Sequence, residues 1–127
     1  MNIQARKLLV KAKLIGRKFS VSEDAVTDTG AAFTVIPPET ADYLELELNK
    51  DYPKATLVTA SGIIETPVKI LNRIEVANIK VENLPVVIHK IPDPAPVKIL
   101  LGMNFIESVK LIVDGKKGTF DLEDPQS

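Results

Sequence analysis

The sequence AVTDTGAAFTVI, at residues 25–36, contains the feature that decides the fold. Asp28 ends one apolar segment and is followed by Thr29, Gly30 and a second apolar segment. A carboxylate between apolar strands is expensive to bury unless hydrogen bonds or charges hold it ionised. Gly30 permits a close approach that a side chain would forbid, and Thr29 offers a hydroxyl to a tight junction. The stretch predicts a carboxylate at a strand-to-strand junction, although Asp-Thr-Gly is also ordinary turn composition, in which Asp28 simply caps a turn.

The residues on either side of this junction predict a mainly β protein. Val, Ile and Thr, which favour strands, supply 34 of the 127 residues. Residues 8–15 alternate apolar residues with Lys11 and Lys13, as a strand with one buried face does. Further strands are expected at residues 19–21, 25–27, 33–36, 55–60, 63–71, 74–76, 86–88, 98–101, 110–113 and 119–122, and short helices at 38–44 and 103–109.

Composition excludes several functional classes. Sixteen Lys and Arg against seventeen Asp and Glu leave a formal charge of −1, too little positive charge for nucleic acid to be the main partner. The chain has no cysteine and a single histidine, His89, so we expect no disulfide, no thiol nucleophile, no metal and no cofactor. No apolar stretch approaches the roughly 20 residues of a membrane-spanning helix, so we expect no membrane partner and a cytoplasmic location. Residues 1–127 are expected to form one domain, with 123–127 a mobile tail.

Three features in register resemble the retropepsin family, the retroviral-type aspartic peptidases. DTGAAFTVI at 28–36 is similar to the active-site loop of that family. PVKILLGMN at 96–104 resembles its second signature, in which aliphatic residues and a glycine lead into a short helix. TASGII at 59–64 occupies the place of the flap, a mobile hairpin with a glycine near its tip. The proline-containing loop at 91–96 suggests a cellular or prokaryotic member of the family.

This resemblance implies an all-β, single-domain retropepsin-like fold, a closed β-barrel or sandwich with one or two short helices, that functions as a C2 homodimer. It implies an aspartic endopeptidase in which Asp28 of each subunit meets its mate, Thr29 locks the two loops together and Gly30 lets the substrate backbone approach. Two carboxylates about 3 Å apart share one proton, so one activates a water and the other donates a hydrogen bond to the scissile carbonyl. The polypeptide substrate would bind in an extended conformation. The residues expected to contact it are Ala31, Ala32, Ser61, Gly62, Ile63, Ile64, Val97 and Ile99.

Three residues depart from the retroviral pattern. Ala32 and Phe33 stand where retroviral members commonly carry acidic residues that contact substrate, so that recognition scheme does not transfer. Met103 stands where those members usually carry an arginine that helps hold the dimer, so the interface must be stabilised differently. The alternative to an enzyme is a non-catalytic dimeric module of the same fold that binds peptides or serves in regulation, because fold alone does not establish function.

Overall fold

The computed structural model describes residues 1–4, 6–91 and 97–125, and this part of the chain is mostly β, as predicted. In chain order the elements are β1 (Leu8–Ile15), β2 (Ser20–Thr27), β3 (Thr34–Ile36), α1 (Pro38–Tyr43), β4 (Glu47–Leu48), β5 (Lys54–Thr59), β6 (Gly62–Val76), β7 (Ile79–Ile88), β8 (Ile99–Leu101), α2 (Met103–Ile106), β9 (Lys110–Asp114) and β10 (Thr119–Glu123). None of the helices described is long and apolar enough to cross a membrane.

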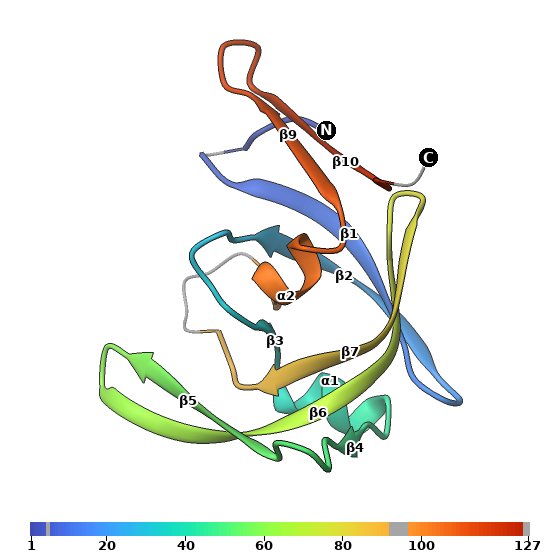
Figure 1. Cartoon of the computed structure of the whole chain (residues 1–127), viewed down its shortest axis with the longest axis vertical. Coiled ribbons are helices and arrows are strands. Elements are labelled where there is room, and N and C mark those ends of the chain that lie inside the picture. Colours follow the sequence, from blue (N-terminus) through green and yellow to red (C-terminus); the bar gives the residue numbers. More distant parts are fainter. Residues whose placement is uncertain (5, 92–96, 126–127) are drawn as a thin grey trace.

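Six of these strands close into a barrel (Figure 1). The ring runs β1, β2, β8, β3, β7 and β6, and a pairing between β6 and β1 completes it. Most neighbours are antiparallel, whereas β2 with β8 and β3 with β7 are parallel. Alternation explains the interior: in β1, Val10, Ala12 and Leu14 are buried and the lysines between them are exposed. The core also takes Phe105 from α2 and Phe120 from β10, both almost completely buried.

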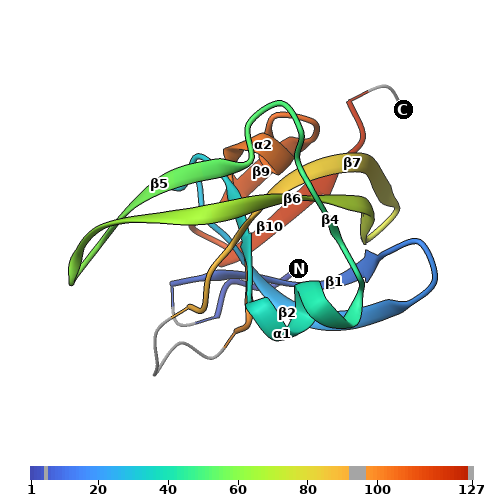
Figure 2. The same ribbon diagram turned by 90° about the horizontal axis from the view of Figure 1, so that it is seen from below.

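Two hairpins extend from this barrel. Strand β6 is 15 residues long, and its second half belongs to the barrel while its first half pairs with β5. The β5–β6 hairpin therefore projects beyond the body of the protein, as both Figure 1 and Figure 2 show. The second hairpin, β9–β10, is a separate two-stranded sheet. The N-terminal residues lie along β10, where Asn2 bridges Thr119.

The closed barrel and its short helices agree with the predicted fold class, and β1 has its predicted bounds. Two predicted strands, 63–71 and 74–76, are one continuous strand, because the polar residue Arg73 between them bonds to carboxylates on the exposed barrel face and does not break the ladder. Its partners are Glu75 of β6 and Glu82 of β7, and both raise the pKa of Arg73. Residue Glu123, expected to begin a mobile tail, is the last residue of β10. Residues 92–96 of the proline-containing loop and 126–127 of the tail lie outside the described residues.

Candidate active site

The loop at 28–33 begins where two strands of the barrel run in parallel. Thr27, the last residue of β2, pairs with Leu101, the last residue of β8. The backbone N–H of Asp28 then donates to the carbonyl of Leu101 at 2.9 Å. The N–H of Ala31 donates back to the carbonyl of Asp28 at 3.3 Å, which turns the chain sharply. The parallel pairing of β2 with β8 thus holds Asp28 in a fixed position at the end of the barrel.

The carboxylate of Asp28 is held on one side and open on the other. Its Oδ1 accepts a hydrogen bond from the N–H of Gly30 at 2.8 Å. A Cβ on Gly30 would lie 3.2 Å from the same oxygen, so glycine leaves room for this tight arrangement. Asp28 is half-buried, whereas Thr29 and Gly30 are exposed. Within the described part of the chain the Thr29 hydroxyl makes no hydrogen bond. The loop therefore presents unused hydrogen-bonding groups to whatever approaches it.

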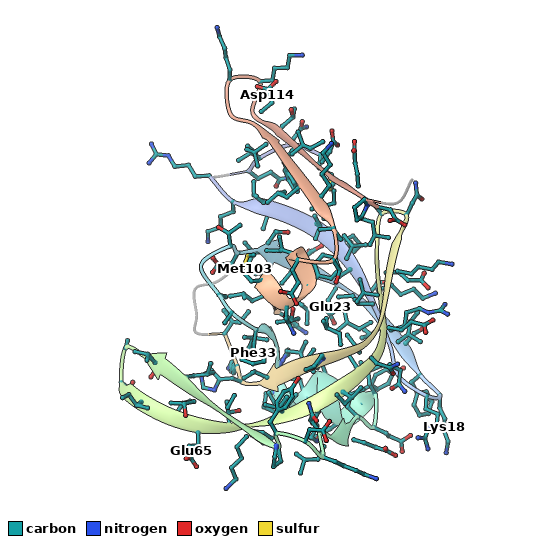
Figure 3. All side chains as sticks on the ribbon, in the orientation of Figure 1. Lys18, Glu23, Phe33, Glu65, Met103 and Asp114 are labelled. Atoms are coloured by element: carbon teal, nitrogen blue, oxygen red, sulfur yellow. The ribbon has the colours of Figure 1, made fainter. Side chains whose placement is uncertain are left out.

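Helix α2 supports this loop from behind. The N–H of Met103 donates to the carbonyl of Ala31 at 2.7 Å, and the N–H of Asn104 donates to that of Ala32 at 3.1 Å. These are N–H groups that the start of a helix leaves free. Gly102 lies so close to Phe33 that a Cβ there would collide with the Phe33 carbonyl. Figure 3 shows Met103 on α2 beside the loop that joins β2 to β3. Loop and helix are thus one unit.

Asn104 and Thr34 fix that unit to the barrel. The Oδ1 of Asn104 accepts from the Thr34 N–H at 2.8 Å and from the Thr34 hydroxyl at 2.9 Å. Its Nδ2 donates to the carbonyl of Pro85 in β7 at 2.7 Å. The Thr34 hydroxyl also accepts from the N–H of Gly102 at 3.2 Å. Sequence reasoning placed Asn104 in the second signature without giving it a role, because a bond between residues 70 positions apart leaves no local pattern.

A hollow of about 480 Å³ adjoins Asp28. Val97, one of the expected substrate contacts, lines it. Arg6 and Lys7 also line it, and sequence analysis did not single them out. A second hollow, of about 470 Å³, lies between the loop and α2. Ala31 and Ala32 line that one, so the expected contact residues divide between two sides of the loop.

The expected flap is the β5–β6 hairpin. Its turn is Ala60–Ser61, and Gly62 has a φ of +120°, in the region that favours glycine. The Thr59 hydroxyl donates to the Gly62 carbonyl at 2.9 Å and accepts from the Ser61 N–H at 3.2 Å, which ties the tip together.

The two isoleucines of the flap lie on opposite faces. Ile64 pairs with Leu57, and both are half-buried. Ile63 pairs with Val58, and these are 72% and 83% exposed. Glu65, two residues after Ile63 and so on the same face, points away from the barrel in Figure 3. Ile64 therefore faces the body of the protein, whereas Ile63 faces outward.

Alternation also separates the residues of β8. Ile99 is completely buried in the core of the barrel. Leu100 is half-buried and pairs with Val26 of β2 and Val35 of β3. Because Asp28 follows Val26 by two residues, Leu100 belongs to the face that leads to the carboxylate. Because side chains alternate between the two faces of a strand, the sequence ILL at 99–101 already indicated that Leu100 faces the opposite side from Ile99.

Comparisons with known proteins agree with the fold. A family model described as gag-polyprotein putative aspartyl protease matches residues 16–108. Among solved structures, the crystal structure of a retropepsin-like aspartic protease from Rickettsia conorii is similar, with a TM-score of 0.69 over 96% of this chain and 86% of that chain. The two sequences are 21% identical, so this likeness speaks for the fold. A search among curated proteins gave no match.

Proposed function

Because the chain belongs to the gag-polyprotein putative aspartyl protease family, which its match over residues 16–108 shows, we propose that it is an aspartic endopeptidase acting as a homodimer. Each chain has one Asp-Thr-Gly loop, so it contributes one of the two carboxylates that this chemistry needs. The other comes from a second copy. An isologous two-fold interface brings Asp28 of one subunit opposite Asp28 of its partner.

The observation that carries this proposal is that only some of the hydrogen-bonding groups of the Asp28 loop have partners. Gly30 fixes one oxygen of Asp28, and the Thr29 hydroxyl has no hydrogen bond within the described chain. A partner loop related by a two-fold axis would offer its own hydroxyl and backbone groups to Thr29. Two carboxylates held this close share one proton, because both cannot ionise. The ionised partner takes a proton from water, the protonated one donates to the scissile carbonyl, and the water oxygen attacks the carbonyl carbon.

The surface beside the loop suits a second copy of the chain. Ala32, Phe33 and Met103 line the hollow between the loop and α2, where retroviral members carry charged residues. Met103 is 37% exposed. Apolar side chains at the centre of an interface gain from the removal of water without leaving an unpaired charge. These apolar side chains are therefore proposed to form part of the dimer contact, with the exposed Glu107 lining the same hollow.

Substrate is proposed to bind as an extended strand between the flap and the loop, with its side chains alternating between pockets. Ala31, Ala32, Ser61, Gly62, Ile64 and Val97 are the proposed contacts. Two of the expected contacts, Ile63 and Ile99, are not proposed to touch the substrate. Ile63 pairs with Val58 on the outer face of the flap, and Ile99 packs behind Leu100.

The test is Asp28→Asn, which keeps the shape of the side chain and removes its charge. We expect the variant to remain dimeric by sedimentation and to lose cleavage of unfolded polypeptides, because two amides cannot activate water. Asp42→Asn, on the exposed face of α1, is the matched control and should cleave normally. If Asp28→Asn turned over substrate as fast as the unaltered protein, Asp28 would not be catalytic.

A further inference from the structure

The hollow beside Asp28 combines apolar walls with positive charge. Its lining residues are Arg6, Lys7, Leu8, Val26, Thr27, Asp28, Thr29, Ile91 and Val97. Four of these are aliphatic and two are cations. At about 480 Å³ it lies within the size range of ligand pockets, and Asp28 itself forms part of the wall. In the proposed peptidase, a substrate side chain in this hollow would lie close to Asp28.

The two cations have no ion-pair partner in the described structure. Ion pairs there engage Lys11, Arg17, Arg73 and the N-terminal amine, whereas Arg6 and Lys7 form none. The nearby carboxylate of Asp24 lies 2.7 Å from the Lys11 ammonium, so its charge is already compensated. Within the described part of the chain, the positive charge of Arg6 and Lys7 is therefore not engaged in an ion pair.

Backbone hydrogen bonds between Gln4 and Lys7 hold the chain beside these cations. The N–H of Gln4 donates to the Lys7 carbonyl at 3.1 Å, and the N–H of Lys7 donates to the Gln4 carbonyl at 2.8 Å. Within this turn Arg6 has a φ of +63°, a conformation that a non-glycine residue adopts at a cost. The turn leads directly into Leu8, the first residue of β1 and part of the wall. The backbone that carries the cations is thus continuous with the barrel, whereas Arg6 and Lys7 themselves are exposed.

We propose that this hollow is a specificity subsite for an acidic substrate side chain, with glutamate preferred over its neutral analogue glutamine. The inference rests on the proposed peptidase function and adds the class of substrate to it. The methylene groups of glutamate would pack against Val26 and Val97, while its carboxylate would reach Arg6 and Lys7. Among the described residues that line the hollow, Asp28 is the only acidic one, so two cations face a single carboxylate there.

The test uses fluorogenic peptides that are identical except for Glu, Gln or Leu at each residue flanking the scissile bond. We expect kcat/KM for the Glu peptide to exceed that for Gln by roughly three- to tenfold, as two partly solvated ion pairs would give. Added salt should reduce the ratio, because exposed charges are screened. In the double variant Arg6→Gln/Lys7→Gln the ratio should fall to about one. The control Lys116→Gln/Lys117→Gln removes two exposed lysines from the β9–β10 turn and should keep the ratio.

A binding measurement separates this inference from the proposed function. The same peptides are titrated by fluorescence anisotropy onto Asp28→Asn, which is not expected to cleave them. Tighter binding of Glu than Gln, lost in the triple variant with Arg6→Gln/Lys7→Gln, supports the subsite even if the unaltered protein cleaves nothing. Equal binding of Glu and Gln overturns the subsite, even if cleavage is robust. A double variant that keeps the Glu preference but weakens the dimer also overturns it, since the cations would then serve the interface.

Discussion

Replacement of Asn104 by alanine should uncouple the Asp28 loop from the barrel. The change removes three side-chain hydrogen bonds, two to Thr34 and one to the Pro85 carbonyl. Thr34 is completely buried, so its N–H would be left without a partner and without water. At about 1 kcal/mol for each lost bond, with a further 1–2 kcal/mol for the unsatisfied N–H, the free energy of unfolding should fall by about 4 kcal/mol. That is a large part of the 5–15 kcal/mol typical of a domain.

Urea unfolding at one fixed protein concentration measures this loss, because the stability of the proposed dimer would depend on concentration. With an m-value of about 2 kcal/mol/M, the midpoint should fall by roughly 2 M. Asn72→Ala is the matched control: Asn72 is exposed on β6, and its loss should change stability by no more than about 0.5 kcal/mol. If Asn104→Ala unfolded within 1 kcal/mol of the unaltered protein, the network would not hold the loop.

Three other experiments have defined outcomes. Thr27 is 5% exposed, and its hydroxyl has no hydrogen-bond partner in the described structure. Thr27→Val should therefore raise the free energy of unfolding by about 1 kcal/mol in the same urea assay. A lower free energy of unfolding would mean that the hydroxyl has a hydrogen-bond partner. Gly102→Ala places a Cβ against the Phe33 carbonyl and should displace the Asp28 loop. We expect a large drop in kcat with little change in circular dichroism. A normal kcat would contradict the close approach of Gly102 to Phe33. Ile64→Ala should lower kcat/KM for peptides more than Ile63→Ala, because only Ile64 faces the body of the protein; the reverse order would contradict the assignment of the flap faces.

Much of the fold could be predicted from the sequence because buried apolar and exposed polar residues alternate along its strands. Lys11 and Lys13 mark the exposed face of β1, and that strand was predicted with its observed bounds. The prediction failed where polar residues lie inside a long strand. Separate strands were expected at 63–71 and 74–76, yet β6 is continuous through Arg73, which bonds to Glu75 and Glu82. Such pairing between strands depends on register, which local composition does not reveal.

The candidate site was predictable in its motif and less so in its surroundings. Asp28 and Gly30 follow from a short motif, and the hydrogen bond between them is local. Asn104 acts through Thr34, which is distant in sequence, and Arg6 reaches the hollow through a turn that precedes the first strand. Contacts that form only when the barrel closes leave no periodic signal in the chain. Structure was needed to find them.

The central claim is that two chains combine one carboxylate each into a single catalytic pair. The most direct measurement is the distance between the two Asp28 carboxyl groups in a crystal structure of the assembled protein. The account predicts oxygen atoms about 3 Å apart across a two-fold axis, within reach of a shared proton. A monomer, or a dimer formed through another surface with the two carboxylates many ångströms apart, would contradict it.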